Sequence, residues 1–233
     1  MLKTILNLLF PIQCVICNKY QDQGHVCNDC WAKITFITKP YCAICSFPFD
    51  YESDLKAICG YCVMRKPNYD QAIAIMKYDY NSKNLIQKFK YQDQLHILDY
   101  FINLMLNMGR EVIEQADIVA PIAMHRYKLF KRGYNQAALL AMRIAKESNL
   151  QYVPQLITKI KTVSAQAELS KEARLKNIKN SFQLNPKFKS HIKGKNILLI
   201  DDVITTGATI SECCRIIRAE EPAKILVLTL AKT

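Results

Sequence analysis

Apolar and polar residues follow a pattern that predicts strands alternating with helices over most of the chain. Runs of apolar residues indicate buried strands at 71–80, 117–120, 156–160, 196–202 and 224–230. Apolar residues at helical spacing indicate helices at 81–89 and 95–106, and we expect further helices at 135–146 and 209–219 and a charged helix at 170–179. Strands that alternate with helices are typical of an α/β domain, so we expect a largely parallel sheet flanked by helices.

The first 66 residues break this pattern, because cysteine dominates them. Two thiolates at CxxC spacing bind one tetrahedral zinc ion from a single turn, and a second CxxC pair completes the coordination. We therefore expect two structural Zn²⁺ ions in a small module at 1–66, a linker near 64–69, and a second domain at 67–233. The four CxxC pairs are Cys14/Cys17, Cys27/Cys30, Cys42/Cys45 and Cys59/Cys62.

The sequence leaves the pairing of these motifs open. Sequential pairing gives two zinc ribbons with 9 and 13 residues between their CxxC pairs, whereas interleaved pairing satisfies the same ligand count. His25 offers a further ligand close to Cys27, although a bystander role is favoured. Thiol redox chemistry is the alternative to zinc. The other two cysteines, Cys213 and Cys214, are interpreted as ordinary residues of the expected helix 209–219.

Composition and charge argue against a membrane-spanning or secreted protein and favour one with an anionic partner. Half of the 233 residues are hydrophobic, which is enough for a core, and no apolar run reaches the roughly 18 residues of a transmembrane helix. The apolar start carries no secretory cleavage site, so we expect a cytoplasmic protein. The net charge of +12 is concentrated in residues 125–195, where 16 Lys and Arg stand against 3 Asp and Glu. This imbalance favours an anionic partner.

The strongest chemical signal follows the expected strand 196–202. That strand ends in two carboxylates, Asp201 and Asp202, at the sheet edge where ligands bind in open α/β folds. A tight loop then starts a helix, and its N–H groups suit a phosphate monoester. The carboxylates suit sugar hydroxyls or a metal ion, so we interpret the region as a site for a ribose 5-phosphate. The loop residues are Thr205, Thr206, Gly207, Ala208 and Thr209.

This loop resembles the phosphoribosyl-pyrophosphate (PRPP) motif of type I phosphoribosyltransferases. Two further segments resemble the ComF-type (GntX-like) competence proteins, PIAMHRYKLFKRGYNQA at 121–137 and KTVSAQAELSKEARLKNIKNSF at 161–182. The cysteine-rich start resembles that family as well, so the resemblance covers nearly the whole chain. One departure lies at 125–128, where HRYK replaces a more arginine-rich run.

The resemblance implies a role for each part of the site. Asp201 and Asp202 would lie near the ribose 2′ and 3′ hydroxyls as catalytic residues, and the loop would surround the 5-phosphate. Basic residues would neutralise the pyrophosphate, with Mg²⁺ sharing that task and bridging to the ribose oxygens. Asn135 and Gln136 are expected to cap or pack the following helix instead. The basic candidates are Arg126, Lys128, Lys131, Arg132 and Arg174.

The resemblance also implies a role in natural transformation, in which single-stranded DNA enters the cytoplasm beside a helicase-like translocase. The protein would reach the inner face of the membrane through its partners. Phosphoribosyl transfer is the implied enzyme activity, and no residue indicates the acceptor. The alternative is a non-catalytic accessory protein that binds single-stranded DNA and keeps a vestigial or regulatory phosphate site. Tyr127, Phe130 and Tyr134, which lie near basic residues, support that alternative.

Overall fold

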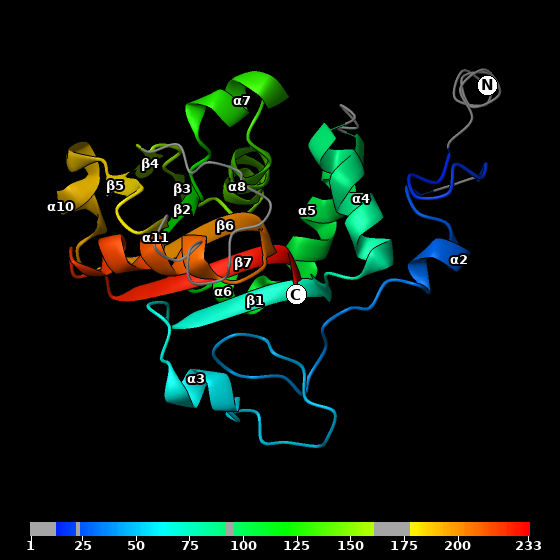
Figure 1. Ribbon diagram of the computed structural model, residues 1–233, viewed down its shortest axis with the longest axis horizontal. Coiled ribbons are helices and arrows are strands. Elements are labelled where there is room, and N and C mark those ends of the chain that lie inside the picture. Colours follow the sequence, from blue (N-terminus) through cyan, green and yellow to red (C-terminus); the bar gives the residue numbers. More distant parts are fainter. Residues whose placement is uncertain (1–12, 22–23, 92–95, 161–177) are drawn as a thin grey trace.

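The computed structural model describes residues 13–21, 24–91, 96–160 and 178–233, and its centre is a five-stranded sheet (Figure 1). The strand order is β1-β7-β6-β2-β3, and every neighbouring pair is parallel, which confirms the expected α/β fold. All five carboxyl ends therefore lie at one edge of the sheet. The strands are β1 (Gln71–Lys77), β2 (Ile118–Pro121), β3 (Gln151–Tyr152), β6 (Asn196–Ile204) and β7 (Lys224–Lys232).

Strands β6 and β7 lie in the middle of the sheet because both of their faces can be buried. Every side chain from Ile197 to Ile200 and from Ile225 to Leu228 is at most 1% exposed. Continuous apolar runs of this kind are typical of parallel strands covered on both sides. The run in β6 stops at Asp201, which is paired in register with Thr229 of β7. The first charged side chains of β6 thus appear where the strand reaches the carboxyl edge.

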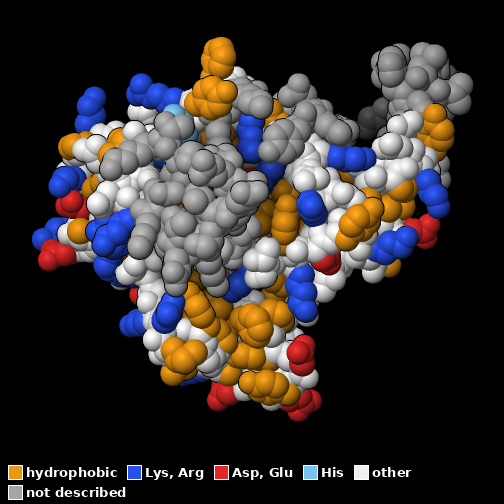
Figure 2. All heavy atoms as spheres, viewed as in Figure 1, with side chains coloured by type: hydrophobic (Ala, Val, Ile, Leu, Met, Phe, Trp, Pro, Cys, Tyr) orange, Lys and Arg blue, Asp and Glu red, His pale blue; other side chains and the backbone are white. Residues whose placement is uncertain are grey.

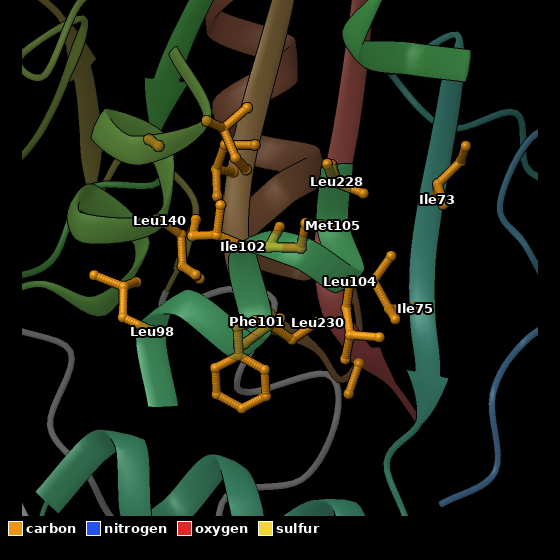
Figure 3. Packing of buried hydrophobic residues seen from close by; sticks show 14 of the residues in the cluster. Ile73, Ile75, Leu98, Phe101, Ile102, Leu104, Met105, Leu140, Leu228 and Leu230 are labelled. Atoms are coloured by element: carbon orange, nitrogen blue, oxygen red, sulfur yellow. The ribbon is translucent and has the colours of Figure 1, made fainter. Parts of the chain in front are cut away.

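Three long helices cover one face of the sheet. They bury one continuous hydrophobic cluster between themselves and the strands. In Figure 3, Ile102 and Met105 of the middle helix lie between Leu140 of a neighbouring helix and Leu228 of β7. The helices are α4 (Tyr80–Tyr91), α5 (His96–Met108) and α8 (Gln136–Glu147), and the short α6 (Arg110–Ile113) adds Val112 and Ile113 to the cluster.

The other face is covered by α11 (Ala208–Arg218) and by a separate antiparallel pair of strands. The expected strand at 156–160 does form, as β4 (Ile157–Lys159), but it pairs with β5 (Phe182–Leu184) and not with the main sheet. A 3₁₀ turn, η1 (Pro186–Phe188), and the short α10 (Lys189–Ile192) then lead back into β6.

The cysteine-rich part packs against the edge of the sheet. Its two short helices are α2 (Asn28–Trp31) and α3 (Gly60–Met64). Between them, residues 35–37 run antiparallel to β1: Ile37 N–H donates to the Ile75 carbonyl (2.9 Å), and Lys77 N–H donates to the Thr35 carbonyl (2.8 Å). This pairing covers the backbone groups that an edge strand would otherwise expose.

The segment expected as a linker is fixed to the second domain. The Asn68 side-chain amide donates to the Ser211 carbonyl of α11 (3.3 Å), and Arg218 donates to the Asn68 carbonyl (3.1 Å). Arg218 also pairs with Asp70 at 2.7 Å. The chain therefore enters β1 through a segment that is hydrogen-bonded to α11.

Several elements differ from the sequence-based expectations. The structure adds α6, β3, β5 and a helix α7 (Arg126–Arg132) that the apolar pattern does not indicate. The helix expected at 170–179 lies almost entirely outside the described residues. None of the helices in the described part of the chain is both long enough and apolar enough to cross a membrane.

Candidate functional site

The cysteines gather into two clusters of four thiols. Within each cluster all four Sγ atoms lie within 4.8 Å of one another. The CxxC motifs are therefore paired sequentially, and interleaved pairing is excluded. His25 belongs to neither cluster. The clusters are Cys14, Cys17, Cys27 and Cys30, and Cys42, Cys45, Cys59 and Cys62.

The thiol geometry fits tetrahedral zinc. The Sγ atoms of Cys17 and Cys27 are 3.7 Å apart, as are those of Cys45 and Cys59. A Zn–S bond of about 2.3 Å in a regular tetrahedron places two sulfurs about 3.8 Å apart. Four thiolates leave no coordination position for a substrate, so these sites have the character of structural zinc centres.

Each cluster stabilises its first thiolate with backbone hydrogen bonds. Cys27 N–H donates to the sulfur of Cys14 (3.4 Å), and Cys59 N–H donates to the sulfur of Cys42 (3.3 Å). Burial acts to raise the pKa of both thiols, but backbone N–H donors outweigh it and lower the pKa of Cys14 to about 6 and that of Cys42 to about 7. Both thiols are therefore readily deprotonated, as metal binding requires.

The paired carboxylates lie at the carboxyl edge of β6, on opposite faces of the sheet, because neighbouring residues of a strand alternate. Asp202 faces α4, where its Oδ2 is 2.8 Å from Nζ of Lys90. Asp201 faces the α11 side, and its Oδ1 accepts a hydrogen bond from Asp202 N–H (2.9 Å). Burial, and then the charge of Asp202, raise the pKa of Asp201 to about 8. Both residues nevertheless remain partly exposed.

The loop after β6 presents the start of α11 to this same edge. Gly207 is the N-cap residue, with φ +70° and ψ 0°, in the left-handed region that favours glycine. Thr205 and Thr206 are exposed, and Thr206 Oγ1 accepts from Ala208 N–H at 3.4 Å. Thr233 fixes the loop to the end of β7, because its hydroxyl donates to the Thr205 carbonyl at 3.1 Å. The loop is thus held in place while its hydroxyls face outward.

Two family models match the chain. The double zinc ribbon domain matches residues 5–63, and the phosphoribosyl transferase domain matches residues 132–233. Competence protein F of Haemophilus influenzae is 28% identical over 230 residues, which cover 96% of this chain and 98% of the relative. The chain is thus similar over almost its whole length to proteins named for competence and DNA utilization.

Other relatives extend the comparison. DNA utilization protein YhgH of Escherichia coli is 25% identical over 233 residues, which cover 97% of this chain and 99% of the relative. Among solved structures, the allosteric regulatory enzyme of purine biosynthesis is 16% identical, with a TM-score of 0.41, over 62% of this chain and 30% of that one. That likeness is too distant to add to the argument.

Four of the five basic candidates belong to helix α7. Arg126 is exposed at the start of α7, and Arg132 at its end donates to Gln136 Oε1 at 3.5 Å. Lys128 and Lys131 belong to the same helix, which connects β2 to α8. Arg174 lies outside the described residues. The structure therefore places one basic helix after β2, next to the β6 loop in strand order.

Asn135 caps α8 as expected, accepting from Ala137 N–H at 3.1 Å. Gln136 is fully buried, and its amide donates to the Lys90 carbonyl at 3.2 Å. Lys90, the direct partner of Asp202, is the site residue that sequence reasoning missed. In the sequence, Lys90 directly follows Phe89, a residue of the apolar stripe of α4. A lysine at such a position resembles an ordinary solvated lysine, so the sequence carries no specific signal for it.

Proposed function

We propose that this protein binds PRPP together with Mg²⁺ at the carboxyl edge of its sheet and acts in natural transformation. One observation carries the proposal: β6 carries two carboxylates near its carboxyl end, just before Val203 and Ile204, and a glycine-capped loop then turns the N-terminus of an 11-residue helix toward the same edge. The helix start supplies N–H donors and partial positive charge for the 5-phosphate. Asp201 and Asp202 supply acceptors for the ribose hydroxyls.

The donor set fits a magnesium ion. Mg²⁺ prefers carboxylate oxygens and shared phosphate oxygens over a cage made only of protein groups. Asp202 already holds a cation, because the Lys90 ammonium lies 2.8 Å from its Oδ2. When bound, Mg²⁺ would neutralise charge on the pyrophosphate. The chain's own residues would orient the ribose through Asp201 and Asp202 and would hold the phosphate at Thr205–Thr209.

Calorimetry and thermal unfolding test the binding proposal. At a PRPP concentration of about 100 times Kd, with Mg²⁺ present, ligand binding is expected to stabilise the protein by about 2.7 kcal/mol. The double variant Asp201→Asn/Asp202→Asn should lose this stabilisation. The double variant Glu220→Gln/Glu221→Gln is the matched control, because it removes two adjacent acids that precede β7 at the opposite edge. If millimolar Mg²⁺ and PRPP give the wild-type protein neither a binding signal in calorimetry nor a higher melting temperature, the proposal is contradicted.

The cellular part of the proposal is supported by the relatives, whose names are Competence protein F and DNA utilization protein. Residues 125–195 carry 16 Lys and Arg against 3 Asp and Glu, which suits contact with a polyanion. We therefore place the protein in the cytoplasm, where it would meet incoming single-stranded DNA beside a helicase-like translocase. Deletion of its gene is expected to lower transformation frequency without lowering DNA capture at the cell surface.

A second candidate function, non-catalytic binding of single-stranded DNA, is favoured by one surface. Helix α7 exposes 90% of Phe130 and 66% of Tyr127 between its basic residues. Figure 2 shows apolar side chains and Lys and Arg side chains at the top of the molecule, over this helix. Exposed aromatic rings among cations can stack on bases while the backbone is neutralised.

A salt titration separates the two functions. If three or more phosphates are contacted, affinity for single-stranded DNA should fall about tenfold or more between about 50 and about 200 mM salt. Phe130→Ala should weaken DNA binding and leave PRPP binding intact, and Asp201→Asn/Asp202→Asn should do the reverse. Weak DNA binding that does not respond to salt or to Phe130→Ala would count against this second function.

A further inference from the structure

The ion pair between Lys90 and Asp202 is unusual among the ion pairs of the described residues. It is the only one in which both side chains are less than a fifth exposed, at 18% for Lys90 and 16% for Asp202. The two residues come from α4 and β6, which are 112 positions apart in the sequence. A lysine side chain that is only 18% exposed loses most of its hydration, so the carboxylate is the group that stabilises its charge there.

The backbone around Lys90 is held from a third element. Gln136 donates to the Lys90 carbonyl (3.2 Å), and the Tyr134 hydroxyl donates to the Phe89 carbonyl (2.8 Å). Phe89, which precedes Lys90 in α4, is fully buried. The last turn of α4 is thus fixed to the start of α8. The four-carbon side chain of Lys90 has rotatable bonds, through which its ammonium can change position while the backbone stays in place.

Among the described residues, Asp202 is the carboxylate that forms an ion pair with this ammonium. Asp201 directly precedes Asp202 in β6 and faces the other side of the sheet. One cation of unit charge therefore occupies the place at Asp202 where a divalent ion would bind. A free metal ion must displace that ammonium, and the displaced ammonium then needs another anion.

We propose that Lys90 is a built-in cation that holds the metal position at Asp202 until a magnesium–phosphate ligand binds. The Lys90 ammonium then moves onto the phosphate-bearing part of that ligand. The inference rests on the proposed function, because it assigns the residue that couples metal binding to PRPP binding at the same site. It predicts that the metal alone binds weakly and that the metal–ligand complex binds well.

The test measures metal binding and ligand binding separately on the full-length protein with its zinc sites filled. Free Mn²⁺, a spectroscopic substitute for Mg²⁺, is followed by electron paramagnetic resonance without PRPP, and Mg²⁺–PRPP binding is followed by calorimetry. Lys90→Gln should bind Mn²⁺ about tenfold more tightly than wild type and Mg²⁺–PRPP about tenfold more weakly. Lys90→Arg, which keeps the charge, should bind Mn²⁺ as weakly as wild type does.

The matched control is Lys83→Gln, which removes an exposed lysine two turns earlier on α4 and should change neither affinity. Melting temperature and zinc content show that each variant is folded. Unchanged Mn²⁺ affinity in Lys90→Gln would overturn the inference, and tighter Mn²⁺ binding without weaker Mg²⁺–PRPP binding would overturn the transfer of the ammonium. The Mn²⁺ measurement contains no PRPP, so a wild-type protein that fails to bind PRPP would refute the proposed function by itself.

Discussion

Replacing Gly207 by alanine is expected to damage the ligand site more than the fold. Gly207 has φ +70°, and a Cβ added there would meet only the Ile204 Cγ2 atom, at 3.9 Å. The substitution therefore meets no steric obstacle in the folded protein. Its cost comes from holding an L-residue in the left-handed region, which is about 1–2 kcal/mol.

Gly194 supplies the matched control for this prediction. It has φ +68° and no atom within 4 Å of an added Cβ, and it lies in the turn before β6, at the opposite edge of the sheet. Gly194→Ala and Gly207→Ala should therefore lose similar free energies of unfolding in urea, about 1–2 kcal/mol each. Only Gly207→Ala should also lose Mg²⁺–PRPP affinity, by about tenfold or more, because the loop backbone must approach the phosphate closely.

Urea unfolding of the zinc-loaded protein measures the stability, and calorimetry with Mg²⁺ and PRPP measures the affinity. Equal stability losses with an affinity loss in Gly207→Ala alone would support the assignment of the loop. Two outcomes would refute the reasoning. One is a Gly207→Ala protein that binds PRPP as well as the wild type, and the other is an equal loss of affinity in Gly194→Ala.

Three further predictions follow from single residues. The folded-state pKa of Asp201, about 8, lies above its unfolded value of about 3.9, so its contribution to stability is full below about pH 4 and is lost as pH rises from about 4 to about 8; Asp201→Asn should reduce the fall of the melting temperature between about pH 5 and pH 8 in metal-free buffer. Cys17→Ser should reduce bound zinc from two ions to about one per chain in a colorimetric assay, whereas Cys213→Ser, outside both clusters, should leave it at two. Gly109→Ala should lower the free energy of unfolding by about 1–3 kcal/mol in urea, because its Cβ would lie 2.5 Å from the Met105 carbonyl oxygen and 2.6 Å from Leu228 Cδ1; an unchanged free energy of unfolding would contradict this prediction.

The sequence predicts the centre of the sheet well because burial on both faces leaves an unambiguous signal. The apolar runs of β6 and β7 require cover on both sides, and only a parallel sheet between helices supplies it. Helix α7 leaves no such signal, since Phe130 is 90% exposed and the helix has no continuous apolar face. Its ends are set locally, by His125, whose ring accepts from Tyr127 N–H, and by Gly133 at φ +77°.

The residues of the candidate site also differ in whether a local sequence pattern predicts them. Asp201, Asp202 and the loop after them are contiguous in sequence, so their proximity follows from a strand, a turn and a helix. Lys90 reaches Asp202 only because α4 packs beside the end of β6, and no local pattern encodes that meeting. The zinc ligands are an intermediate case, since CxxC spacing identifies each half-site, whereas only the folded chain decides which halves meet.

The zinc ribbons contact the elements that carry the candidate site, which gives them a place in its architecture. In the first ribbon, the Ile16 carbonyl accepts from Lys88 Nζ of α4 at 3.1 Å, two residues before Lys90. In the second, the Cys45 carbonyl accepts from Lys232 Nζ at 2.7 Å, next to Thr233, whose hydroxyl donates to the loop. The first ribbon thus contacts α4, which carries Lys90. The second contacts the end of β7, which is hydrogen-bonded to the loop after β6. Because metal binding supplies much of the folding free energy of such small modules, the zinc centres stabilise the walls of the site from outside it.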